Sequence, residues 1–386
     1  MKRHLWLIGL FLCMGIAGCK RQTMQISCEG EYVRYEASGV DLLSSGVIKK
    51  ITAIPLETQR QSLIGILHQL YVADNGDYYI VTLKRYSNVL RFDAHGNFLN
   101  VIGRRGRGPQ EFIEIADFSF DGMGNPIVYS DLDNTAYYFS PDGKFLKSVD
   151  LGTRFLRATY DRDNDHFLYL GFNNIVGKWR LQKVDNEGNV VQGYLENDYK
   201  VLMFGEATPV FSHHRDAVYL REAYNNVVYR LRGNEIEVAF RFDFGRYNIP
   251  QSFFRKKDAI EASESLVAND FMATRRFMQN DDYILFEAMI QKADNHDTPT
   301  VIMVHGIKNK KTDSWSWFER EIDSLSPDGD LITTSIQWLS SRNEIVCLVD
   351  PSKILEYRDH PLLANPEVIA GLTNNSNHVI LLCEFE

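Results

Sequence analysis

Cysteines and metal-binding motifs are scarce in this sequence. Its 386 residues include five cysteines, and none of them forms a Cys-x-x-Cys motif or belongs to a Cys/His cluster. That scarcity argues against a structural zinc site. Cys347 and Cys383 lie in apolar, strand-like runs, which predicts buried thiols, although in an exported protein the two could instead form a disulfide.

Linkers and long hydrophobic runs are also missing. The apolar run at residues 5–17 is too short to span a bilayer as a helix, and no Pro/Ser-rich segment divides the chain into domains. Without residues 1–18, which hold two basic residues and no acidic one, 40 basic residues face 51 acidic ones, a net charge of −11. An acidic surface of this kind argues against nucleic acid as a partner.

The N-terminus has the features of a secretory signal peptide. Lys2 and Arg3 precede the apolar run, and the small residues before Cys19 suit a cleavage site. The segment Ile16-Ala17-Gly18-Cys19 resembles a bacterial lipobox, in which the cysteine becomes the first mature residue and carries fatty acyl chains such as palmitate. We therefore expect a signal peptide at residues 1–18, lipidation of Cys19 and a tether at residues 19–45. An ordinary signal peptide with a coincidental cysteine is the alternative.

A repeat of about 45 residues runs through the middle of the chain. Four strand–turn–strand units have their turn glycines at Gly96, Gly143, Gly188 and Gly233, at steps of 47, 45 and 45 residues. Glycine suits such turns because a two-residue hairpin needs positive φ. A period of this length with four short strands is typical of a propeller blade.

The remaining segments complete a ring. A fifth hairpin spans residues 299–318, after an insertion at about 247–273 that reads as one or two amphipathic helices with Phe253, Ile260, Val267 and Phe271 on one face. The sixth unit has a helix-like stretch at 351–373 and lacks one strand, which the N-terminal segment 47–57 can supply. We therefore predict an all-β, six-bladed β-propeller over residues 46–386, closed by the N-terminal strand, with both helical insertions on one face.

The chain resembles the bacterial six-bladed β-propeller lipoproteins, relatives of the NHL-repeat propellers. The resemblance rests on the lipobox, on the segment NVIGRRGRGPQEF and on the closing strand NHVILLCEFE, and it covers about residues 45–386. Gln110 stands where glycine is common in that family. The resemblance implies the fold and an envelope location, but little chemistry, since most such proteins have no assigned activity.

The glycine-rich segment VIGRRGRGPQEF does not fit a phosphate-binding loop. Its spacing, Gly103-x-x-Gly106-x-Gly108, reverses the dinucleotide fingerprint, and another strand follows rather than a helix. We interpret it as a corner between blades one and two. Loops on this face supply the candidate binding residues Arg104, Arg105, Arg107, Arg255, Lys256 and Lys257. Alternatively these cations are solvated or pair with Glu111, Glu114 and Asp117.

No catalytic residue can be assigned. A lactonase-like metal site, for example for Ca²⁺, could recruit Asp117, Asn173, Asn225 and Glu287 at the axis. His213 and His214 are neighbours on a strand and point to opposite faces, so they cannot share one ion, and His305-Gly306 has no accompanying nucleophile motif. Trp315 and Trp317 face one side of a strand, as a sugar platform or, as we favour, in packing between blades.

The sequence therefore predicts an envelope lipoprotein that binds a partner protein or a polar small molecule on its loop face, without a cofactor. The absence of an acidic run after Cys19 favours an outer-membrane position facing the periplasm. The alternative is a hydrolase or lactonase with a metal or carboxylate site in the axial pocket, and fold alone does not decide between them.

Overall fold

The computed structural model describes residues 30–82, 88–161, 165–171, 177–197, 208–292, 300–323, 331–333 and 335–385. The predicted signal peptide, Cys19 and Asn173 lie outside these ranges. Within them, no helix has the length and apolar character needed to cross a membrane.

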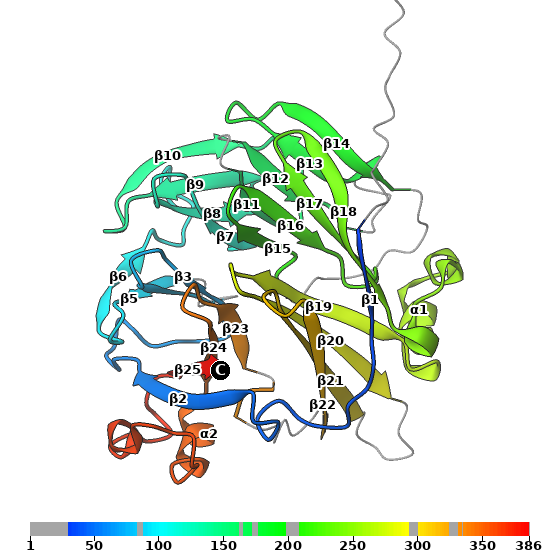
Figure 1. Cartoon of the computed structure of the whole chain (residues 1–386). Helices are drawn as coiled ribbons and strands as arrows, with labels where there is room; N and C mark the ends of the chain where they lie inside the picture. The colour runs from blue at the N-terminus through cyan, green and yellow to red at the C-terminus, as the bar shows by residue number, and fades with distance from the viewer. Residues whose placement is uncertain are drawn as a thin grey trace, which may run out of the picture.

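Six sheets stand around a common axis and form the blades of a six-bladed propeller (Figure 1). Blades one and two consist of β3 (Leu67–Val72), β4 (Tyr78–Thr82), β5 (Val89–Phe92) and β6 (Phe98–Ile102), then β7 (Asp117–Phe120), β8 (Pro126–Ser130), β9 (Thr135–Phe139) and β10 (Phe145–Asp150). Blade three holds β11 (Arg157–Tyr160), β12 (His166–Tyr169), β13 (Trp179–Val184) and β14 (Val190–Glu196).

Blade four holds β15 (Phe211–His214), β16 (Ala217–Arg221), β17 (Val227–Arg232) and β18 (Glu235–Asp243). Blade five holds β19 (Met272–Gln279), β20 (Tyr283–Lys292), β21 (Thr300–Asn309) and β22 (Ser314–Asp323). Blade six holds β23 (Ile336–Leu339), β24 (Glu344–Val349), β25 (Val379–Phe385) and, as its outer strand, β2 (Ile48–Pro55). The N-terminal closure of the ring is thereby confirmed, with Ile51 opposite Cys383 in the register.

The turn glycines of the repeat mark where consecutive blades touch. Gly143 and Gly188 have φ of +80° and +84°, a region that L side chains rarely adopt. A Cβ on Gly143 would lie 2.3 Å from the carbonyl oxygen of Val101 in blade one, and one on Gly188 would lie 2.2 Å from that of Asp150 in blade two. Each turn therefore needs glycine both for its backbone conformation and for its contact with the outer strand of the preceding blade.

An additional strand precedes the closing strand. β1 (Glu31–Arg34) pairs in parallel with β18 and makes blade four five-stranded. Beyond it, the carboxylate of Glu319 accepts hydrogen bonds from the backbone of Ser38 and Gly39, and Leu42 is buried. The segment predicted as a tether up to residue 45 thus packs on the propeller from residue 31 onward.

The first helical insertion joins blades four and five. It contains η2 (Gly245–Tyr247), η3 (Gln251–Arg255) and α1 (Ala259–Ala268), as predicted, but its buried face is different. Phe253, Ala262 and Leu266 are buried, whereas Ile260 is 71% exposed. The prediction assumed one continuous helical phase; the side chain of Asp258 instead caps a new helix, which resets the phase.

The second insertion connects the second and third strands of blade six and contains α2 (Pro351–Glu356) and η4 (Pro366–Ile369). Its chain then runs along β2. The backbone N–H of Ile51 donates to the carbonyl of Leu362 (2.8 Å), and that of Ala364 donates to the carbonyl of Ile51 (2.9 Å). The insertion therefore covers the outer edge of the closing blade, at the bottom of Figure 1.

The core is divided among the interfaces between blades. Trp315 and Trp317 stack with ring centroids 5.5 Å apart and pack with Phe242 and Phe286 between blades four and five. The packing interpretation of the two tryptophans is therefore right, and a sugar platform is not formed. Cys347 and Cys383, in blade six, are buried and are not joined in a disulfide.

Candidate ligand-binding site

The segment from Gly103 to Phe112 is a corner, as predicted, and joins β6 to β7. The N–H of Gly106 donates to the carbonyl of Phe112 (2.9 Å), and that of Gly108 donates to Oε2 of Glu111 (3.0 Å). Arg104 lies 3.4 Å from the same carboxylate. The N–H groups of Gly106 and Gly108 are thus already used inside the loop.

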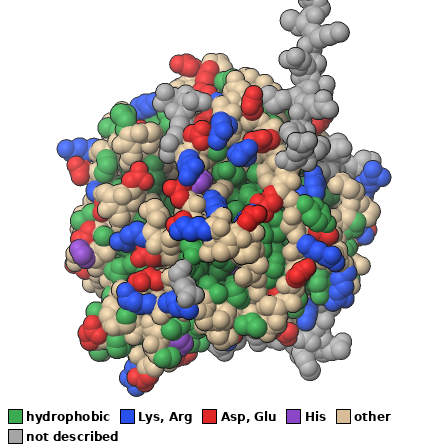
Figure 2. Space-filling model, viewed as in Figure 1, with side chains coloured by type: hydrophobic (Ala, Val, Ile, Leu, Met, Phe, Trp, Pro, Cys, Tyr) green, Lys and Arg blue, Asp and Glu red, His purple; other side chains and the backbone are tan. Residues whose placement is uncertain are grey.

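The six predicted binding cations are not brought together. Arg104, Arg105 and Arg107 lie between blades one and two, whereas Arg255, Lys256 and Lys257 lie between blades four and five, three blades further around the ring. Arg104 and Lys256 pair with Glu111 and Glu261 at 3.4 and 3.5 Å. The two groups stand on opposite sides of the ring and do not form one patch. Figure 2 likewise shows charges of both signs mixed over the face in view.

Polar side chains instead gather on the inner strands around the axis. Asp117, the first residue of β7, is 5% exposed and accepts hydrogen bonds from the hydroxyl of Tyr71 (2.9 Å) and the N–H of Ala158 (3.2 Å). These contacts link blades one, two and three. Burial raises the pKa of Asp117 in spite of the opposing effect of Arg157.

Arginine and histidine side chains surround this carboxylate. Arg157 opens β11 and donates to the carbonyl of Ala116 (2.8 Å), next to Asp117. His68, on β3, is largely buried, and burial together with Arg157 and Arg276 lowers its pKa to about 3. His68 is therefore neutral at physiological pH, and it stands in the field of two arginines from other blades.

Arg276 comes from the inner strand of blade five and is 6% exposed. Its Nη1 lies 3.2 Å from Oε1 of Glu287, which also accepts from Nε of Arg275 (2.7 Å). Burial alone would raise the pKa of Glu287, but Arg276, His305 and Arg275 outweigh it and hold that pKa well below its usual range. Glu287 is therefore an anion at neutral pH, paired with two arginines.

Three buried polar atoms on consecutive inner strands have no hydrogen-bond partner in the described part of the chain. They are Nε2 of His68 on β3, Nε of Arg276 on β19 and Oε1 of Gln337 on β23. An unsatisfied buried polar group costs about 1–3 kcal/mol, so these atoms mark a place where another molecule would be stabilised. We call His68, Asp117, Arg157, Arg276 and Gln337 the axial cluster.

The axial cluster lies where the inner strands begin on the loop face, which is the face predicted for binding, but the sequence did not identify its members apart from Asp117. His68 and Arg157 are polar residues in short strands that are otherwise buried, LHQLYV and RATY. A polar residue in such a strand was therefore a sign of a special role. The sequence could not show that these residues form one site, because only ring closure brings the inner strands together.

Of the four residues proposed for a metal site, the three that the structure describes are engaged with other partners. Asn225 bonds to Glu222 (2.9 Å) and Tyr229 (3.2 Å) within blade four, and Asp117 and Glu287 are engaged as described above. Among the described residues, no group of three histidine, cysteine, aspartate or glutamate side chains is placed to hold a metal ion.

The two adjacent histidines point apart, as predicted. Nε2 of His213 lies 2.7 Å from the Thr159 hydroxyl, whereas Nε2 of His214 lies 3.0 Å from Oδ1 of Asp281. His305 faces Glu287 at 3.6 Å and is 1% exposed, so it forms part of the buried ion cluster of blade five.

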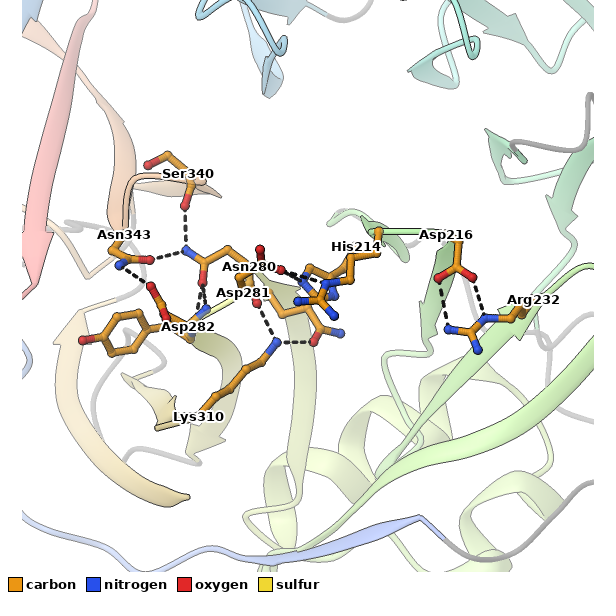
Figure 3. Close-up of polar contacts among 12 residues, drawn as sticks. His214, Asp216, Arg232, Asn280, Asp281, Asp282, Lys310, Ser340 and Asn343 are labelled. Atoms are coloured by element: carbon orange, nitrogen blue, oxygen red, sulfur yellow. Dashed lines mark hydrogen bonds and ion pairs between the residues drawn. The ribbon is translucent and has the colours of Figure 1, made fainter. Parts of the chain in front are cut away.

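Hairpin turns of blades four, five and six are tied together on the opposite face (Figure 3). The side chain of Asn280 in blade five donates to the carbonyl of Ser340 (2.7 Å) and to Oδ1 of Asn343 (2.9 Å) in blade six. His214 and Asp281 join blades four and five in the same way. These contacts hold the neighbouring turns in fixed positions.

The fold and its N-terminal closure define the class: a six-bladed β-propeller. The chain belongs to the family described as Domain of unknown function (DUF4934), which matches residues 33–384. No curated protein matches it.

Two solved structures have a similar fold. One is a protein of Bacteroides fragilis NCTC 9343 that is inferred to be exported. It has a TM-score of 0.74 and 16% sequence identity, and the match covers 92% of this chain and 99% of that chain. A member of the DUF4221 family from Bacteroides vulgatus ATCC 8482 has a TM-score of 0.50 at 12% identity, over 87% and 96% of the two chains. At such identities the likeness concerns the fold alone.

Proposed function

We propose that this protein is an exported lipoprotein, anchored through Cys19, whose propeller binds an anionic ligand at the axial cluster. The observation that carries the proposal is the set of unsatisfied polar atoms on His68, Arg276 and Gln337, beside the arginines of the axis. An anion would satisfy the donors among them and offset the buried positive charge.

The charge balance at the axis supports an anion over a cation. Arg157, Arg275 and Arg276 face two carboxylates, Asp117 and Glu287, and burial raises the pKa of Asp117. His68 adds no charge at neutral pH because its pKa is about 3. In a chain of formal net charge −9, a local positive site of this kind favours small anions, since a large acidic partner would be repelled by the surrounding surface.

An envelope location is supported by the lipobox-like segment before Cys19 and by the inferred export of the similar Bacteroides fragilis protein. Replacing Cys19 with Ser tests the anchor. We expect the wild type in the membrane fraction and radiolabelled by palmitate, and the variant unlabelled and released. Labelling of the variant, or equal membrane retention of both proteins, would refute the anchor.

Native mass spectrometry of the protein purified from envelopes tests the binding site. We expect a retained small molecule on the wild type and its loss in Arg157→Gln and in Arg276→Gln, each verified as folded by circular dichroism. The matched control is the Arg104/Arg105/Arg107→Gln triple variant, which removes exposed cations from the corner loop and should keep the ligand. Retention in both axial variants, or loss only in the control, would place binding elsewhere.

A further inference from the structure

A space of about 340 Å³ lies between blades four and five and is bordered by Glu31 of β1. Its polar lining includes Glu31, Arg230, Gln279, Lys308 and Lys310. Ligand sites in proteins commonly span about 300–1,000 Å³, so the space suits a small organic molecule. It lies beside the turns of Figure 3, away from the loop face that holds the axial cluster.

Lys310 differs from the other cations in this lining. Its Nζ donates to Oε1 of Gln279 (2.8 Å) and to the carbonyl of Asn280 (2.5 Å), both neutral oxygens. Lys308, by contrast, is paired with Glu31 (2.7 Å) and Asp313 (2.6 Å). Among the described residues, no carboxylate lies within ion-pair distance of Lys310.

The amide of Gln279 adds a free donor next to Lys310. Its Oε1 accepts from the lysine, which leaves its Nε2 as a buried atom with no hydrogen-bond partner among the described residues. Burial lowers the pKa of Lys310, and Arg215 and Lys308 act in the same direction, against the opposing effects of Asp281 and Asp282. A negative group here would therefore gain a charge-assisted hydrogen bond from Lys310 and a hydrogen bond from the side-chain amide of Gln279.

Part of the wall of this space is apolar. Val238, Ala239 and Phe240 of β18 and Ile284 of β20 line it. A free inorganic anion would leave this wall in contact with water. A molecule with an anionic group and an apolar body would bury it, at about 25 cal/mol for each square ångström of apolar surface.

We propose that this space is a binding site for an organic anion with an apolar body, whose charged group is held by Lys310 and Gln279. The site is separate from the axial cluster. Glu31 of β1 is the one carboxylate in the lining, and it accepts hydrogen bonds from Lys308 Nζ and from Trp315 Nε1 (3.0 Å). Glu31 thus borders the site and opposes the ligand's charge.

Fluorescence titration with 1-anilinonaphthalene-8-sulfonate, an anion with an apolar aromatic body, tests the site. The uncharged parent compound N-phenyl-1-naphthylamine, which lacks the sulfonate, reports binding to apolar surface alone. We expect Lys310→Met to weaken binding of the sulfonate at least tenfold and to leave the neutral probe unaffected. Lys310→Arg, which keeps the charge, should restore most of the affinity.

The neighbouring lysine provides the matched control. Lys311 is 74% exposed and pairs with Asp282 at 3.1 Å, so Lys311→Gln should bind the sulfonate as the wild type does. Glu31→Gln should strengthen binding, because it removes the opposing carboxylate. Equal sulfonate binding by wild type and folded Lys310→Met, or an equal loss in Lys311→Gln, would overturn the proposal. The titration involves no axial residue, so its failure would leave the axial proposal standing.

Discussion

Arg180 of blade three and Glu222 of blade four form a bidentate ion pair that solvent barely reaches. Nε of Arg180 lies 2.8 Å from Oε1 of Glu222 and Nη2 lies 3.2 Å from Oε2, with the two side chains 6% and 0% exposed. The pair joins β13 of blade three to the end of β16 in blade four and so ties the two neighbouring blades together.

Glu222→Ala should lower the free energy of unfolding by about 3–5 kcal/mol, because it removes the carboxylate that neutralises a buried guanidinium. Urea denaturation followed by circular dichroism measures the change. The Arg180→Met/Glu222→Leu double variant should lose much less, since it removes both charges and keeps an apolar contact. A single-variant loss below about 1 kcal/mol would contradict a desolvated pair.

Gly306 marks the closest packing against the stacked tryptophans. A Cβ at this position would lie 2.6 Å from the ring of Trp317, which is held by its neighbours. Gly306→Ala should therefore cost about 1–3 kcal/mol of stability. Gly371→Ala is the control, because nothing lies within 4 Å of its added Cβ. Equal melting temperatures for the two variants would show that the interface between blades four and five accommodates the added methyl group without loss of stability.

Acid should destabilise the protein through His166. The ring is fully buried, with Tyr129 and Tyr138 hydroxyls 3.0 and 3.1 Å from its two nitrogens, and burial lowers its pKa to about 4. Because the unfolded value is 6.5, the unfolded chain binds the proton first, so stability present above pH 6.5 is lost as the pH falls towards 4.

Between pH 7 and 5 the wild type should thus lose about 2 kcal/mol more than His166→Gln, which has no group to titrate there. Urea denaturation at the two pH values gives the comparison. Parallel losses in the two proteins would mean that His166 is charged in the folded state or that the ring site admits water.

Closure by β2 should be required for folding. A chain that begins at Gly30 keeps all the contacts described here and should be monomeric, with a cooperative melting transition. A chain that begins at Thr58 leaves the edge of β25 unpaired and should aggregate, because an open edge strand recruits other chains. Size-exclusion chromatography distinguishes the two, and a soluble, folded chain from Thr58 would contradict the role of β2.

Much of the fold was predictable because its signals are local. The turn glycines Gly96, Gly143 and Gly188 sit in every case at a contact with the preceding outer strand, so their spacing counts the blades. The position of the helical insertion was predicted correctly, but its buried face was not, because the cap at Asp258 starts a new helix and interrupts the helical periodicity. The strand β1 was missed, since four residues carry too little pattern.

The site was less predictable because its residues share no local pattern. Arg104, Arg105 and Arg107 attract attention as a cluster in sequence, yet they form an exposed corner. His68, Arg157 and Arg276 are isolated in sequence, and they come together only when their separate blades meet at the axis. The available signal was the presence of single polar residues in short, largely buried strands. These residues form a site only because closure of the ring brings the inner strands together.

Anomalous diffraction from crystals soaked in sodium bromide tests the axial site most directly. Bromide is a small anion that replaces a carboxylate or phosphate oxygen at arginine donors. The account predicts a bromide peak within hydrogen-bond distance of Arg276 Nε, between Arg276 and His68, and its absence in Arg276→Gln crystals. An empty axis in the wild type, with bromide bound only at surface residues such as Arg104 and Arg107, would contradict the account.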